Sequence, residues 1–169
     1  MNMHSYRNPV STKKMTVQQI KSMVYRTGKA VPVIEHVHTL VPLGESETNQ
    51  RFPVLEGILG VQDVIQECIV THYNANGQMV SEIFLALQYR PEDPINIALQ
   101  QLYAGSIWRG DIVAMKKGKR VLVTALKNGA DVAAAKHAVD MFLRDTHPIL
   151  LAVVGAQHIM PTFPSVLVV

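Results

Sequence analysis

Apolar residues recur at helical spacing near the start of the chain. Three of them would lie on one helical face: Val17, Ile20 and Val24. Thr16 and Gln19 form a capping box at the start of this pattern, and Gly28 stands where a left-handed residue commonly ends a helix. The pattern predicts a helix from about residue 17 to residue 27.

A hairpin is predicted around the Asn-Gly pair at residues 76–77, because this dipeptide favours a two-residue type I′ turn. Such a turn pairs Val70 with Ile83 and Cys68 with Leu85 on one face. Large apolar groups occur on both faces of the two strands. We therefore expect this hairpin to lie in the middle of a sheet that is covered on both sides.

Further strands are expected where β-branched residues cluster. Residues 31–41 predict one strand, and residues 111–115 and 121–126 predict a second hairpin. Residues 54–66 fit a helix or a loop equally well, because two glycines interrupt their apolar stripe. The apolar tail at residues 165–169 is expected to pack against the rest of the protein.

Two later helices are predicted from capping residues and apolar periodicity. Asp93 can cap a helix whose first residue is Pro94. Asp131 can cap a second, strongly amphipathic helix, which Pro148 is expected to stop. After it, residues 149–154 are interpreted as a buried strand.

Strands and helices do not alternate regularly in this order, which argues against a doubly wound parallel fold. The predicted class is α+β, with a mixed or antiparallel sheet that contains two hairpins and three to four helices packed on it. The chain has 169 residues, of which 48% are hydrophobic, so it is long and apolar enough to bury a core. We expect a flexible basic arm over residues 1–15 and a single α+β domain over residues 16–169.

Positive charge is concentrated in two places. The remainder of the chain is net acidic, but six cations precede the first acidic residue, Glu35. They are Arg7, Lys13, Lys14, Lys21, Arg26 and Lys29. A second basic cluster occupies the tip of the predicted second hairpin: Lys116, Lys117, Lys119 and Arg120. Segregated charge of this kind can attract an acidic partner, although a solvated turn can carry like charges without one.

The favoured hypothesis is a non-catalytic binding or interaction protein. It would contact an acidic protein or a nucleic-acid backbone through six cations of the arm and the hairpin tip: Lys13, Lys14, Lys116, Lys117, Lys119 and Arg120. Aromatic residues make up only 6% of the chain, which weakens the case for stacking on bases. Self-association through an edge strand or the C-terminal tail is compatible with this hypothesis.

The alternative hypothesis is a small metal-assisted hydrolase. His36 and His38 lie two residues apart on a predicted strand, so their imidazoles would point to the same side. A further ligand would come from His72 or from a carboxylate of Glu45 or Glu47, although no spacing rule brings these residues together. No nucleophile elbow, zinc-protease helix or phosphate loop occurs in the sequence. The sequence therefore leans away from an enzyme, and we expect neither a cofactor nor an assigned metal site.

The location is expected to be intracellular, in the cytoplasm or the nucleus. Cys68 is the single cysteine and has no internal disulfide partner, which suits a reducing compartment. The sequence holds no apolar run that is long enough to span a membrane. The acid-free start of the chain is also compatible with a mitochondrial presequence.

Overall fold

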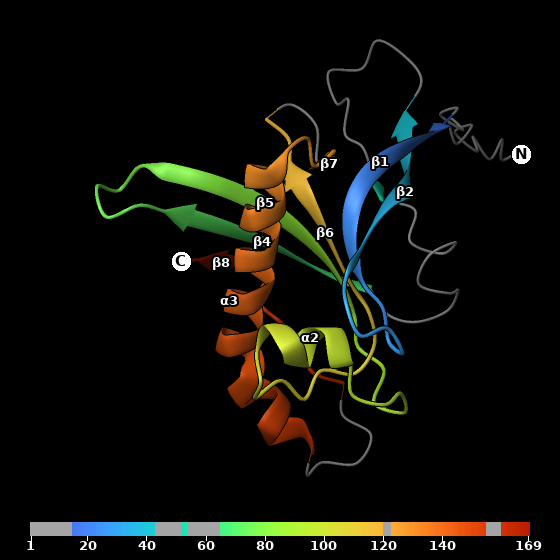
Figure 1. The fold of residues 1–169 in the computed structure, drawn as a ribbon, viewed down its shortest axis with the longest axis vertical. Coiled ribbons are helices and arrows are strands. Elements are labelled where there is room, and N and C mark those ends of the chain that lie inside the picture. Colours follow the sequence, from blue (N-terminus) through green and yellow to red (C-terminus); the bar gives the residue numbers. More distant parts are fainter. Residues whose placement is uncertain (1–14, 43–51, 54–64, 120–122, 155–159) are drawn as a thin grey trace, which may run out of the picture.

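The computed structural model describes residues 15–42, 52–53, 65–119, 123–154 and 160–169. Within them, one mixed sheet has the strand order β3-β2-β1-β6-β5-β4-β8, and β7 pairs with β6 beside this path (Figure 1). Every pairing is antiparallel except that of β4 with β8, which is parallel. The strands are β1 (Met15–Tyr25), β2 (Val33–Pro42), β3 (Phe52–Pro53), β4 (Ile65–Tyr73), β5 (Met79–Gln88), β6 (Ile112–Lys117), β7 (Val123–Thr124) and β8 (Val166–Val168).

The predicted fold class is wrong in its sheet and in its helices. Three to four helices on a sheet with two hairpins were expected, whereas the described residues form a path of seven strands with an eighth at its side. They contain two helices, the short α2 (Ile97–Leu102) and the long α3 (Gly129–Val154). The second predicted hairpin is reduced to a short pairing in which β7 meets the end of β6.

The largest error concerns residues 17–27, which do not form a helix: residues 17–25 belong to strand β1, and residues 26–27 begin the turn that follows it. Ile20 and Val24 are buried on one face of the sheet, and Met23 and Tyr25 are buried on the other. This alternation with a period of two is the signature of a strand with two covered faces. Gly28 has a φ of 80°, but it serves the turn between β1 and β2 and does not end a helix.

The β4–β5 hairpin has the predicted register through most of its length. Val70 pairs with Ile83 and Cys68 pairs with Leu85. The turn is one residue longer than expected, because the Asn74 N–H bonds to the Gln78 carbonyl and the register shifts beside Tyr73. The strand pairing therefore followed from the sequence, while the type of turn did not.

Both helices differ from their predicted boundaries. The side chain of Asn96, and not that of Asp93, accepts the capping bond of α2 from the Leu99 N–H. Helix α3 runs through Pro148 and includes residues 149–154, which were interpreted as a strand. Leu150 is buried in the core, so packing offsets the local cost of the proline. Neither described helix combines the length and apolarity that spanning a membrane requires.

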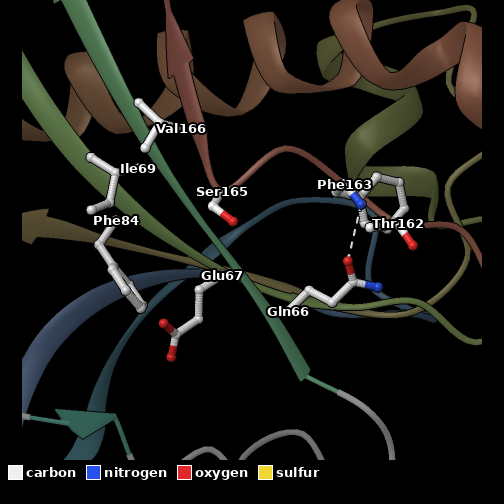
Figure 2. Close-up of a pocket in the computed structure, with 8 residues that line it drawn as sticks. All are labelled: Gln66, Glu67, Ile69, Phe84, Thr162, Phe163, Ser165 and Val166. Carbon is white, nitrogen blue, oxygen red and sulfur yellow. Dashed lines mark hydrogen bonds between the residues drawn. The ribbon is translucent and has the colours of Figure 1, made fainter.

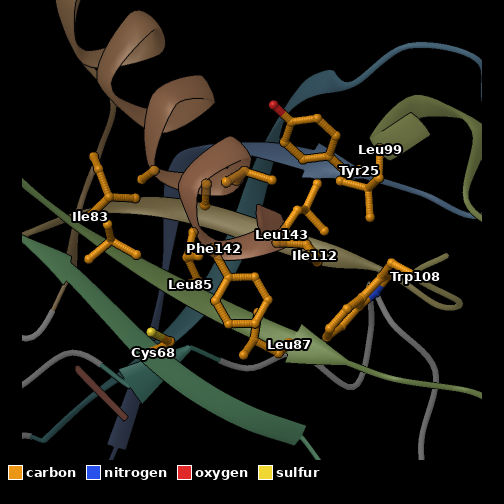
Figure 3. Close-up of a cluster of buried hydrophobic side chains, with 14 of the residues drawn as sticks. Tyr25, Cys68, Ile83, Leu85, Leu87, Leu99, Trp108, Ile112, Phe142 and Leu143 are labelled. Atoms are coloured by element: carbon orange, nitrogen blue, oxygen red, sulfur yellow. The ribbon is translucent and has the colours of Figure 1, made fainter. Parts of the chain in front are cut away.

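The core has two parts, one on each face of the sheet. The larger part lies where α2 and α3 cover β4, β5, β6 and the end of β1 (Figure 3). Trp108 and Phe142 are fully buried there, with ring centroids 5.6 Å apart. The described buried members of the second part all come from strands, and Figure 1 shows the sheet curving at β1 and β2.

We predict that Gly110→Ala destabilises the protein by at least about 3 kcal/mol. Gly110 has a φ of 99°, and a side-chain carbon there would overlap the carbonyl oxygen of Gln88. Gly77→Ala is the matched control, because Gly77 has a φ of 73° but lies in open space. It should cost about 1 kcal/mol in urea unfolding. Equal losses for the two variants would show that the close approach at Gly110 does not constrain the fold.

Candidate functional site

The predicted basic tip is only partly a free cationic surface. The Lys116 ammonium lies 2.7 Å from a carboxylate oxygen of Asp131, and the Lys117 ammonium lies 3.3 Å from one of Glu82. Adjacent residues on a strand point to opposite faces, so these two cations do not form one patch. Lys119 is exposed. The predicted binding residues Lys13, Lys14 and Arg120 lie outside the described residues.

Asp131 ties the basic tip to the start of α3. Its carboxylate accepts bonds from the Lys116 ammonium and from the Lys127 N–H, at 2.7 Å and 2.8 Å. Its own N–H donates to the side chain of Asn128, which caps the helix. Burial raises the pKa of Asp131, but the bonds from Lys116 and Lys127 outweigh it and the pKa is lowered overall. Lys116 therefore has a structural partner.

The histidines of the metal hypothesis are not brought together. His36 and His38 are exposed on β2, and the His38 ring bonds to the Gln19 side chain at 3.1 Å. His72 lies on β4 and stacks against His137 of α3, with ring centroids 4.6 Å apart. In the described part of the chain, no three His, Cys, Asp or Glu residues are placed to hold a metal ion.

The Cys68 thiol is buried, as the predicted register implies. The side chain is fully covered by the core, and this burial raises its pKa to about 11. A neutral thiol without solvent contact is a poor nucleophile. Cys68 therefore contributes packing, and we assign it no part in a site.

The larger of the two main described pockets, about 510 Å³, lies beside β4 and the segment that leads into β8 (Figure 2). Its floor is formed by Ile69 and Phe84. The amide of Gln66 is already engaged, because it accepts from the Phe163 N–H and donates to the Pro161 carbonyl. Glu67 is the one ionisable residue in its described lining. Thr162 and Ser165 are the other polar residues of this described lining.

A second pocket, of about 330 Å³, lies where the β1–β2 turn meets α2 and α3. We name it the Tyr25 pocket. The polar residues of its described lining are Tyr25, Gln101 and Lys136. The apolar residues are Val31, Pro32, Ala98 and Leu102. Apolar walls with a few polar groups are the usual composition of a small-molecule site.

Tyr25 is the unusual member of this lining. The residue is 1% exposed, and its hydroxyl is buried without a hydrogen-bond partner among the described residues. Figure 3 shows the ring packed beside Leu99 with the hydroxyl directed away from the cluster. Burial, and secondarily the charge of Asp140, raise the pKa of Tyr25 far above its usual range. The phenol therefore keeps its proton and can donate a hydrogen bond.

Asn96 positions the walls of the Tyr25 pocket. Its side-chain N–H groups donate to the carbonyls of Tyr25 and Gly110, at 3.2 Å and 2.8 Å. Its side-chain oxygen accepts from the Leu99 N–H at 3.3 Å. The end of β1 and the first turn of α2 are thus joined by one buried amide. This contact holds the Tyr25 backbone against the helix that supplies Ala98 and Leu102.

Sequence reasoning did not identify the Tyr25 pocket. Tyr25 was assigned to a helix, and its place on a covered strand face became clear only from the β1–β6 pairing. Asn96 did have a detectable signal, because an Asn directly before Ile97, Ala98 and Leu99 is a good capping residue. Asp93 and Pro94 gave a competing signal three residues earlier. Lys136 is exposed on α3.

We predict that Asn96→Ala lowers the free energy of unfolding by about 3 kcal/mol, because it leaves two buried carbonyls and a helix N–H without a partner. Asn96→Asp is the matched variant. It keeps the capping acceptor but loses both donors, so most of the loss should persist in chemical denaturation. Full stability of Asn96→Asp would show that the bonds to Tyr25 and Gly110 do not contribute.

We also predict that Asp131→Asn is less stable than the natural chain by about 1–2 kcal/mol at pH 7. The folded state lowers the pKa of Asp131, so its contribution is complete above the unfolded pKa and is lost as the pH falls through the folded value. The difference between the two proteins should shrink below about pH 4. Asp145→Asn, at an exposed position of α3, is the control and should change stability by less than about 0.5 kcal/mol. A pH-independent difference would contradict this account.

Comparison with known proteins gives no relative for this chain: no family model matches it, and no curated protein or solved structure does so significantly.

Proposed function

We propose that the protein is a non-catalytic binding protein that holds a small organic molecule in the Tyr25 pocket. The observation that carries the proposal is that Tyr25, whose buried hydroxyl has no partner among the described residues, is one of the residues that line a pocket of about 330 Å³. A ligand with an acceptor oxygen would complete the hydrogen bonding of this group.

The energetic argument concerns the cost of the bare hydroxyl. A buried polar group without a partner costs about 1–3 kcal/mol relative to one that is hydrogen-bonded. Phenylalanine would fill the same space without this cost, and it would suit the apolar contacts that the ring makes with the core. A tyrosine at this position is therefore explained more readily by a partner outside the described residues than by stability.

The dimensions of the pocket support a small ligand. Its volume lies at the lower end of the usual range for small-molecule sites, roughly 300–1,000 Å³. The hydroxyl itself is covered, so a ligand atom has to displace a neighbouring side chain in order to reach it. Lys136 is long, exposed and part of the lining, which makes it the neighbour that moves at least cost.

Contact with an acidic macromolecule stays a prediction for the cations outside the described residues and for Lys119. Lys116 and Lys117 give it less support than the sequence suggested, because each lies against a carboxylate. The metal-assisted hydrolase gains no support from the described histidines. We therefore place the binding function in the Tyr25 pocket.

We predict that Tyr25→Phe does not destabilise the ligand-free protein and increases its free energy of unfolding by up to about 1 kcal/mol. The same change should weaken the binding of benzyl alcohol, a neutral probe with an acceptor oxygen, by about threefold to tenfold. Thermal unfolding measures the first effect. A titration followed by backbone NMR measures the second, with shifts expected at Val31, Gln101 and Leu102.

Tyr103→Phe is the matched control, because Tyr103 is not among the residues that line this pocket. It should leave the affinity for benzyl alcohol unchanged. A clear loss of stability in ligand-free Tyr25→Phe would mean that the hydroxyl already has a partner within the protein. Probe-induced shifts confined to other regions would place binding elsewhere and contradict the proposal.

A further inference from the structure

Lys136 is the unpaired charge of the Tyr25 pocket. It is exposed on α3 and lines the pocket, and no ion pair involving it is found among the described residues. On the same helix, an ion pair joins the Asp140 carboxylate to the Arg144 guanidinium, at 2.9 Å. The Arg144 guanidinium also lies over the Tyr103 ring, 4.7 Å from its centroid. Asp140 thus has an ion-pair partner in Arg144, whereas the positive charge of Lys136 has none among the described residues.

The polar groups of the lining favour an acceptor. The Tyr25 phenol keeps its proton and can donate, and the Lys136 ammonium is a donor only. Gln101 can donate or accept. Two donors of this kind, one of them cationic, favour an oxygen that carries negative charge. A cationic ligand would meet the uncompensated ammonium and be repelled.

We infer that the ligand of the Tyr25 pocket is a small amphipathic carboxylate, an inference that rests on the proposed function. Its carboxylate oxygens contact the Tyr25 hydroxyl and the Lys136 ammonium. Its apolar part packs on the walls formed by Val31, Pro32 and Leu102.

The lining fits a carboxylate better than a phosphate group. Phosphate sites commonly use bidentate arginine or a nest of backbone N–H groups. The described lining contains no arginine, and its one cation matches the single charge of a carboxylate. A volume of about 330 Å³ suits a compact ring or a short chain.

Benzoate and benzyl alcohol form a matched pair of probes, because they share the ring and differ in the anionic group. Binding of each is measured by NMR titration of the full chain at pH 7 and constant ionic strength. Benzoate should bind about tenfold more tightly than benzyl alcohol, and Lys136→Gln should remove that advantage. Lys136→Arg should retain most of it. Lys119→Gln removes the same charge at a residue outside the pocket and should have no effect.

Equal affinities for the two probes, or no response to Lys136→Gln, would overturn the carboxylate assignment. The proposed function would still stand if benzyl alcohol shifts the resonances of Val31 and Leu102. If neither probe shifts the resonances of the pocket residues, both the proposed function and this inference are wrong. Benzoate binding that weakens equally in Lys119→Gln and Lys136→Gln would show a general charge effect and would also overturn the assignment.

Discussion

The contact on which the site depends is the buried amide of Asn96, which joins the end of β1 to the first turn of α2. It bonds to the carbonyls of Tyr25 and Gly110 and caps the helix with its oxygen. Asn96 and Tyr25 are 71 positions apart in the sequence, so this amide joins distant segments. The position of the Tyr25 ring under α2 and α3 follows from this connection. The Tyr25 pocket lies where Asn96 holds α2 beside the end of β1.

The ring and the hydroxyl of Tyr25 have opposite effects on the stability of the fold. Its ring belongs to the larger part of the core, while its hydroxyl is buried without a partner. Proteins that keep an unsatisfied polar group commonly do so at a functional site, where stability is exchanged for binding. Lys136 adds an unpaired charge at the same place. Neither feature stabilises the protein without a ligand. A small anion bound in the Tyr25 pocket would give both groups a partner.

Some of the fold could be predicted from local pattern, and some could not. The β4–β5 register followed from the apolar faces of the two strands, but the cap of α3 was misassigned: Asn128 accepts the capping bond, and the expected cap, Asp131, donates it from inside the helix. Residues 17–27 were misassigned because Val17, Ile20 and Val24 satisfy a helical period, while the burial of Met23 and Tyr25 on the opposite face depends on pairing with β6. The site shared this difficulty, since its walls come from β1, α2 and α3. The free charge of the predicted hairpin tip was overestimated for a similar reason. The partners of Lys116 and Lys117 lie on α3 and β5.

The central claim is that the hydroxyl of Tyr25 has no acceptor within the protein and receives one from a ligand. A high-resolution crystal structure of the full chain grown with benzoate would test it directly, through the identity of the atom nearest to the Tyr25 oxygen. The account predicts a carboxylate oxygen of benzoate within hydrogen-bond distance, with the Lys136 ammonium beside it. A protein acceptor at that position, such as the carboxylate of Asp140, would contradict it.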